Sequence, residues 1–270
     1  MAIRPPAVAG MFYPDDPEVL RAQVDGLLDA AGLPGPPPKA VIAPHAGYQY
    51  SGSIAALAYA TLRAAADRIE HVMLLGPCHR VGIAALALPG VEAMATPLGD
   101  VPVWADGVER ASALNQVTVS SAVHAQEHSL EVHLPFLQRT LTSFDVLPLA
   151  VGWVDPTAVA EVLDAAWGGP ETLVVVSSDL SHYHPYADAQ RRDRATLTRI
   201  LALDGPIGPD QACGAMPVNG LIVAAARRGA IPSLMGACNS GDTAGDHSRV
   251  VGYAAVRFDE PPTSEGRQRA

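Results

Sequence analysis

The stretch Ala40-Val41-Ile42-Ala43-Pro44-His45-Ala46-Gly47-Tyr48 decides how this chain folds. It begins with an apolar run of strand length and leaves that run through a proline and a histidine. Beyond Ser51-Gly52-Ser53, apolar residues recur at the spacing of one helix face. The stretch therefore predicts a strand, a loop that carries His45, and a helix.

Two other apolar runs end in the same way. The run at 72–75 leads into Gly76-Pro77-Cys78-His79, and the run at 173–176 leads into Ser177-Ser178-Asp179-Leu180-Ser181-His182. In an open α/β sheet, ligands bind beyond the carboxyl ends of the strands. Three strands that each deliver a histidine to that edge predict one shared site, and imidazoles brought together in this way indicate a metal site.

The rest of the chain continues this alternation of strands and helices. Strands are expected at 146–151, 233–238 and 250–258, and helices at 156–166 and about 186–203. This order predicts an α/β fold with a mostly parallel central sheet and helices on both faces.

No long polar linker interrupts the chain, so residues 1–258 are expected to form a single domain. Residues 1–14 contain prolines and large apolar side chains, which predicts an extended arm laid across the core. The polar segment 259–270 is expected to be a disordered tail.

Composition excludes several classes of function. The chain has 270 residues, of which 49% are apolar and 17% charged, and this balance is typical of a globular α/β enzyme. A net charge of −10 argues against a nucleic-acid-binding surface. No stretch suits a bilayer span or a secretory signal, and three scattered cysteines fit reduced thiols. A cytoplasmic protein without nucleic-acid or membrane partners is expected.

His45 and His79 are the best metal-ligand candidates. Each follows a proline within two residues, which stiffens the loop that aims the ring. Neutral imidazole binds most first-row divalent ions. Alternatively, each ring could simply bond a loop carbonyl, but the matching positions at two strand exits favour a metal site.

Asp179 and His182 lie three residues apart beyond the third strand. A carboxylate can orient an imidazole for proton transfer, so we predict His182 as a general acid or base with Asp179 behind it. Asp179 could instead cap the next helix.

The segment 124–133 is the densest cluster of ionisable groups. His124-x-x-Glu127-His128 matches the zinc peptidase pattern H-x-x-E-H. However, a helix is expected from about 127 to 141, and it would leave His124 outside. The alternative is that Glu127 or His128 enters the pocket of His45, and we include His128 among the catalytic candidates.

Asp242 lies in a loop rich in glycine and aspartate. It could complete a site of two histidines and one carboxylate, the arrangement of non-haem Fe(II) oxygenases. It could equally be a turn residue.

Taken together, these motifs resemble the Memo family, including the prokaryotic members called AmmeMemoRadiSam system protein B. They span nearly the whole chain in one order: Arg4 with Pro6-Ala7-Val8-Ala9-Gly10-Met11-Phe12-Tyr13-Pro14, Ala43-Pro44-His45-Ala46-Gly47-Tyr48, Gly76-Pro77-Cys78-His79, Glu127-His128-Ser129-Leu130-Glu131, Ser177-Ser178-Asp179-Leu180-Ser181-His182, and Ser240-Gly241-Asp242 through Gly252-Tyr253-Ala254-Ala255.

The resemblance implies a class III extradiol dioxygenase (LigB)-like fold with a metal pocket at the end of the sheet. It places His45 and His79 on metal-ligand positions, and Asp179 and His182 on pocket positions. Animal members have a cysteine ligand where this chain has Thr243, a poor substitute. The third ligand therefore stays open between Asp242, a water and a residue of 124–128.

The leading hypothesis is a non-haem oxidoreductase that uses Fe(II), with copper or zinc as alternative metals. Its substrate would be a small molecule or a peptide, and the family name implies a radical-SAM protein as partner. A second hypothesis is a scaffold protein that binds a peptide in the same pocket. No arginine cluster accompanies the pocket motifs, which speaks against phosphate recognition. A third is a zinc hydrolase at His124 and His128.

Overall fold

A nine-stranded mixed sheet forms the centre of the protein in a computed structural model, which describes residues 2–32, 35–243 and 246–261. The strands within these ranges are Ile3–Arg4 (β1), Ala40–Ala43 (β2), His71–Pro77 (β3), Leu86–Leu88 (β4), Ala93–Thr96 (β5), Gly99–Pro102 (β6), Val117–Val119 (β7), Asp145–Val151 (β8), Thr172–Ser177 (β9), His182–His184 (β10), Ile231–Asn239 (β11) and Val250–Asp259 (β12). Strands β1, β5 and β6 form a separate small sheet.

The order of the large sheet is β10-β12-β2-β9-β3-β8-β4-β7, with β11 paired to β12. The four central strands β2, β9, β3 and β8 are mutually parallel. In contrast, β12 is antiparallel to β2, and β4 is antiparallel to β8. The predicted α/β class is confirmed, but the sheet is mixed and is mostly parallel only at its centre.

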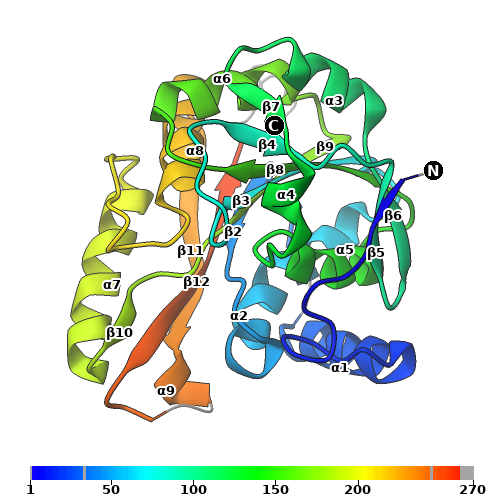
Figure 1. The fold of residues 1–270 in the computed structure, drawn as a ribbon. Helices are drawn as coiled ribbons and strands as arrows, with labels where there is room; N and C mark the ends of the chain where they lie inside the picture. Colours follow the sequence, from blue (N-terminus) through cyan, green and yellow to red (C-terminus); the bar gives the residue numbers. More distant parts are fainter. Residues whose placement is uncertain (1, 33–34, 244–245, 262–270) are drawn as a thin grey trace, which may run out of the picture.

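Helices cover both faces of this sheet (Figure 1). They are Pro17–Ala30 (α1), Tyr48–Ala60 (α2), Ala105–Ser112 (α3), Ser121–Ala125 (α4), Leu134–Thr140 (α5), Pro156–Ala166 (α6), Tyr186–Leu201 (α7), Ala215–Arg228 (α8) and Ser240–Thr243 (α9), with 3-10 turns at Thr61–Ala65 (η1) and Glu131–His133 (η2). In Figure 1, α3, α6 and α8 lie above the central strands, and α1, α2 and α5 lie below them.

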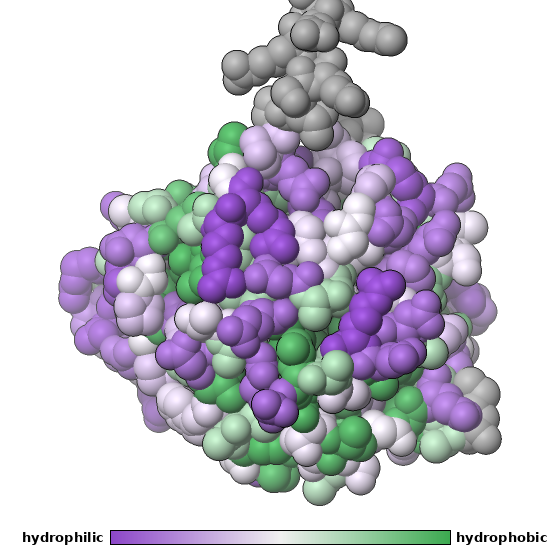
Figure 2. All heavy atoms as spheres, turned by 90° about the horizontal axis from the view of Figure 1, so that it is seen from above, coloured by the Kyte–Doolittle hydropathy of each residue, from purple (hydrophilic) through white to green (hydrophobic). Residues whose placement is uncertain are grey.

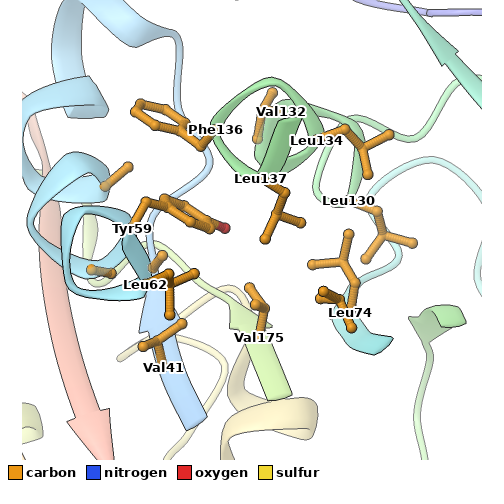
Figure 3. Packing of buried hydrophobic residues seen from close by; sticks show 14 of the residues in the cluster. Val41, Tyr59, Leu62, Leu74, Leu130, Val132, Leu134, Phe136, Leu137 and Val175 are labelled. Atoms are coloured by element: carbon orange, nitrogen blue, oxygen red, sulfur yellow. The ribbon is translucent and has the colours of Figure 1, made fainter. Parts of the chain in front are cut away.

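Strand side chains alternate between two apolar cores because successive residues of a strand point to opposite faces. Val41 and Ala43 of β2 join the core under α1, α2 and α5, whereas Ala40 and Ile42 join the core under α6 and α8. Figure 3 shows the first core, where Tyr59 and Phe136 stack with ring centroids 5.1 Å apart. Central strands buried on both faces explain the continuous apolar runs in the sequence.

Local sequence signals placed several helices correctly. The carboxylate of Asp16 caps α1 by accepting hydrogen bonds from the backbone N–H groups of Glu18 and Val19, and Pro17 occupies the first turn as predicted. The helix predicted at 156–166 matches α6, which begins after the cap Asp155.

The predicted N-terminal arm is also present and is held by one buried carboxylate. Glu131 pairs with Arg4 and accepts hydrogen bonds from the backbone N–H groups of Ala7 and Val8. The hydroxyl of Tyr13 donates to the same carboxylate at 2.6 Å. Within 10 residues, the arm thus provides four groups that donate to one buried carboxylate, which explains why this segment packs along the core.

Two expectations need correction. The helix predicted from 127 to 141, with a kink or split at Pro135, starts later than expected: residues 126–130 are not helical, and the 3-10 turn η2 begins at Glu131. The helix α5 then begins at Leu134 with Pro135 in its first turn, which suits proline because it lacks an N–H. The predicted tail 259–270 begins too early, because Asp259 belongs to β12 and Glu260 accepts a hydrogen bond from the Trp167 indole. Residues 262–270 lie outside the described residues.

The outer surface mixes polar and apolar residues. Figure 2 shows hydrophilic and hydrophobic residues interspersed on the face seen from above. No helix within the described residues is long and apolar enough to cross a membrane.

Candidate metal centre

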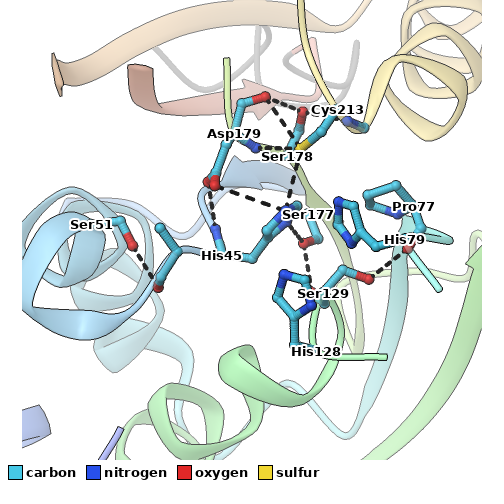
Figure 4. Close-up of polar contacts among 12 residues, drawn as sticks. His45, Ser51, Pro77, His79, His128, Ser129, Ser177, Ser178, Asp179 and Cys213 are labelled. Atoms are coloured by element: carbon cyan, nitrogen blue, oxygen red, sulfur yellow. Dashed lines mark hydrogen bonds and ion pairs between the residues drawn. The ribbon is translucent and has the colours of Figure 1, made fainter. Parts of the chain in front are cut away.

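The carboxyl ends of β2, β9 and β3 lie side by side because these strands are neighbours in the sheet. His45 follows β2, His79 follows β3, and Asp179 and His182 follow β9 between them. The arrangement predicted from the three apolar runs is therefore present, and the ring centroids of His45 and His79 are 5.1 Å apart. Figure 4 shows His45, His79 and Asp179 of this group.

The hydrogen bonds of Ser177 assign the tautomer of His45. The Ser177 hydroxyl donates to the carbonyl of Ser129 at 2.6 Å. Its oxygen lies 2.6 Å from Nδ1 of His45, so it accepts a hydrogen bond from the Nδ1–H group of that ring. Nε2 of His45 keeps its lone pair, and burial lowers the pKa of His45 well below its usual range. His45 is thus a neutral ring ready to act as a ligand.

His79 is oriented in the same manner by Glu127. Its Nδ1 lies 2.9 Å from Oε1 of Glu127 and its backbone N–H donates to Oε2. Burial works to raise the pKa of Glu127, but the hydrogen bonds from His79 and from the backbone N–H of Ser129 outweigh it and lower that pKa to about 2. An ionised Glu127 accepts from Nδ1–H, which leaves Nε2 of His79 free. A carboxylate behind an imidazole is typical of metal-binding histidines.

His128 joins the two histidines. Its ring stacks on His79 with centroids 4.6 Å apart and lies 5.4 Å from the His45 ring. Burial is the main cause that lowers the pKa of His128 to about 4, and the charges of His79 and Arg80 contribute. Of the two alternatives for the segment 124–133, the structure shows the one in which Glu127 or His128 enters the pocket of His45: His128 lines the pocket, and Glu127 lies behind His79.

Among the residues that the structure describes, three sets of side chains have donor atoms close enough to hold one metal ion. In each set the donor atoms lie within 4.8 Å of one another, and the sets are His45 with His79 and Cys213, His79 with Glu127 and His128, and Asp179 with His182 and Cys213.

Cys213 is the residue that the sequence analysis missed. Its Sγ lies 3.3 Å from Nε2 of His45 and accepts a hydrogen bond from the backbone N–H of Asp179 at 3.3 Å. The loop approaches β9 so closely that a Cβ on Gly214 would lie 2.5 Å from the carbonyl oxygen of Ser177. The only local signal was a cysteine before a glycine at a helix start, which carries no metal-ligand spacing.

His182 is not oriented by Asp179 as predicted. Its Nδ1 donates to the carbonyl of Leu180 at 2.8 Å, which leaves Nε2 free, and burial lowers its pKa. Asp179 instead accepts a hydrogen bond from the backbone N–H of His45 at 2.8 Å and so fixes the loop after β2. Burial raises the pKa of Asp179 to about 7.

Two sequence candidates lie away from these donor sets. Asp242 accepts hydrogen bonds from the Tyr186 hydroxyl and from the backbone N–H of Asn239, and Thr243 faces the carbonyl of Ser240. His124 is buried with Nε2 2.7 Å from the carbonyl of Ala87. Within the described residues, neither Asp242 nor His124 belongs to a set that could hold a metal ion.

The donor sets open into a cavity of about 600 Å³. Its lining includes His45, His79, His128, Asp179 and His182. Arg80 and Arg249 also line it, which corrects the expectation that no arginines accompany the pocket.

The donor chemistry fits a divalent transition metal. His45 and His79 each have Nδ1 engaged and Nε2 available, and the Cys213 thiol lies beside them. Burial raises the pKa of Cys213, so this thiol would have to lose its proton to bind a metal. Two imidazoles and one thiolate suit iron, copper or zinc.

Fold and site together define an α/β protein with a histidine-lined pocket at the carboxyl end of its central strands. Two of these histidines, together with Cys213 beside His45, could hold a metal ion. A family model described as "Memo-like protein" matches residues 4–257. The chain belongs to this family, which confirms the resemblance read from its motifs.

Curated relatives agree with this assignment. A MEMO1 family protein of Methanopyrus kandleri is 38% identical over 281 aligned residues, which cover 94% of this chain and 98% of the relative. A MEMO1 family protein of Aquifex aeolicus is 34% identical, with 96% and 100% of the two chains covered.

Proposed function

We propose that this protein is a non-haem Fe(II) oxidoreductase with a fold related to the class III extradiol dioxygenases (LigB-like). The observation that carries the proposal is the convergence of His45, His79 and Cys213, whose donor atoms all lie within 4.8 Å of one another. The two rings are held by Ser177 and Glu127 in the tautomer that leaves Nε2 available. Such fixed donors suit a metal centre better than a pair of histidines with unengaged rings.

His45, His79 and Cys213 would hold the ion, and Cys213 would take the place that the sequence left open for Asp242. When bound, the ion would supply Lewis-acid and one-electron redox chemistry. The thiolate also suits copper and zinc, which remain the alternative metals.

His182 would move protons for a substrate in the cavity. Its Nε2 is unengaged within the described residues, and its lowered pKa keeps the ring neutral near pH 7. A neutral imidazole can accept a proton from a substrate hydroxyl. His128, whose ring stacks on that of His79, would position the substrate or assist this transfer.

The test is metal analysis of protein purified and loaded with Fe(II) without oxygen. We expect His45→Ala and His79→Ala to lose iron, whereas His124→Gln, a buried histidine outside the donor sets, keeps it. Dioxygen consumption with a panel of catechols then tests oxidoreduction, and His182→Gln should lower it without loss of iron. Equal iron in all variants contradicts the metal site, and no dioxygen consumption with any substrate contradicts the oxidoreductase.

The family resemblance supports a cytoplasmic radical-SAM protein as a partner in a modification system. Co-purification of the iron-loaded chain with a radical-SAM protein of the same cell tests this part of the proposal. Failure to recover such a protein from a cross-linked lysate contradicts it.

A further inference from the structure

Two arginines at the cavity reach it from different parts of the chain. Arg80 directly follows His79 after β3, and Arg249 directly precedes β12. Both side chains line the same cavity of about 600 Å³ as the histidines. Sequence motifs could not predict this pair, because its two members are far apart in the chain.

Neither arginine has a carboxylate partner within the described residues. Many arginines elsewhere in the chain do have such a partner, as Arg139 has Asp25 and Arg257 has Asp259. Among the residues that line the cavity, Asp179 supplies the only carboxylate, and its backbone hydrogen bond commits it to the His45 loop. The cavity is therefore locally positive in a chain whose net charge is −10, and unpaired guanidinium groups are ready to bind an oxyanion.

Tyr183 supports Arg249 at the cavity. The guanidinium carbon of Arg249 lies 5.1 Å from the centroid of the Tyr183 ring, which is a stacking arrangement. Tyr183 has a φ of 60°, in the left-handed region that residues other than glycine rarely adopt, and it is 62% exposed. A strained, exposed tyrosine that lines a pocket is a sign of a ligand-facing position.

The cavity walls are aromatic. Phe12, Tyr50, Tyr183 and Tyr253 contribute to the lining, and Phe12 contacts the ring of His128 with centroids 4.7 Å apart. Aromatic walls favour a planar apolar body, because rings stack on them edge to face or offset. The volume suits a small molecule.

We propose that the cavity binds a small ring-bearing anion, whose carboxylate or phosphate is held by Arg80 and Arg249 while its ring lies against the aromatic walls and faces His45 and His79. The inference rests on the proposed function only in naming the substrate class of that site. Carboxylate and phosphate share the oxyanion geometry that a guanidinium group recognises.

The test measures binding of benzoate, phenyl phosphate and neutral benzamide to the full chain. We expect either anion to bind at least about tenfold more tightly than benzamide, as one charge-assisted hydrogen bond would give. Arg80→Gln and Arg249→Gln should each remove most of this preference, and Arg80→Lys should retain part of it. Arg110→Gln is the control, because Arg110 stacks on Trp104 outside the cavity.

The difference between benzoate and phenyl phosphate identifies the anionic group. No saturable binding of either anion up to about 1 mM, or equal binding by the glutamine variants, would overturn the inference. Binding of a phosphorylated peptide without binding of free phenyl phosphate would overturn the small-molecule assignment.

Iron content of the same samples separates this inference from the proposed function. Arginine variants that keep iron but lose anion preference support the inference. If all variants bind iron and every arginine variant keeps the preference for the anions, the inference is overturned and the proposed function is not. If no sample contains iron, the proposed function is overturned. The anion titration still tests the inference, because anion binding can be measured on the metal-free protein.

Discussion

At the scale of single residues, the site depends on which atom of each side chain makes no hydrogen bond that would prevent it from binding a metal. Ser177 and Glu127 occupy Nδ1 of His45 and His79, so the two Nε2 atoms are the ones that can bind a metal. Cys213 lies beside His45, whereas Asp242 has both oxygens engaged elsewhere. Hydrogen bonding, more than residue type, distinguishes the candidate ligands.

Cys213→Ser should therefore weaken metal binding at least tenfold, in line with losses seen when groups around a metal ligand are removed. Cobalt-loaded protein gives a direct readout, because a thiolate ligand produces a charge-transfer band that should vanish in this variant. Asp242→Asn is the matched control and should keep the band. A band that survives Cys213→Ser but not Asp242→Asn would restore the carboxylate as third ligand.

His124 makes stability depend on pH. Burial lowers its pKa from 6.5 to about 4, so between these values the unfolded chain binds a proton that the folded chain does not. The free energy of unfolding should fall as pH decreases through this range, by about 3 kcal/mol from this residue.

His124→Gln retains a donor for the Ala87 carbonyl and removes the titrating group. Urea unfolding of both proteins at several pH values measures the difference. Parallel pH curves for wild type and variant would show that His124 is not the titrating group.

At the scale of elements, the N-terminal arm is joined to the segment that also shapes the site. Glu131 holds Arg4, Ala7, Val8 and Tyr13, and Phe12 of the same arm lines the cavity. Glu131 lies four residues beyond Glu127, which orients His79. Folding of the arm is thereby coupled to the geometry of the pocket.

Glu131→Gln should lower the free energy of unfolding by roughly 3–5 kcal/mol, because it leaves the buried Arg4 cation without its carboxylate. Denaturant unfolding measures the loss. Glu18→Gln, which breaks an exposed pair with Arg21 on α1, is the control and should leave stability unchanged. Equal stability of the two variants would mean that the arm contributes little to folding.

At the scale of the whole molecule, the sheet order brings the site together. β9 lies between β2 and β3, so the ends of three strands that are far apart in the chain form one edge. A ligand bound there contacts segments from residue 45 to residue 213 and links them only in the folded state. Metal binding should therefore stabilise the whole fold.

We expect Fe(II) or Zn(II) at about 100 times its dissociation constant to add about 2.7 kcal/mol and to raise Tm by roughly 5–10 °C. Scanning calorimetry with and without a chelator measures the shift. His79→Ala should abolish it, and His124→Gln should preserve it. A shift of the same size in His79→Ala would indicate binding elsewhere.

The sequence by itself determined the family, the α/β class, and the pairing of His45 with His79. These follow from local patterns: apolar runs of strand length, helix caps such as Asp16, and the rule that strand ends share an edge. The helix expected from 127 to 141 starts later than predicted, because the apolar spacing did not show that η2 and α5 are separated from α4, which ends at Ala125.

Only the tertiary structure revealed the position of Cys213 beside His45, the two arginines that line the cavity and the mixed character of the sheet. Cys213 and His45 are separated by 168 positions, and Arg80 and Arg249 line the same cavity although they are far apart in the chain. Contacts of this kind depend on how strands are ordered and how closely a loop such as that at Gly214 approaches a strand. No local periodicity records them, because they arise from packing between segments rather than from the conformation of any one segment.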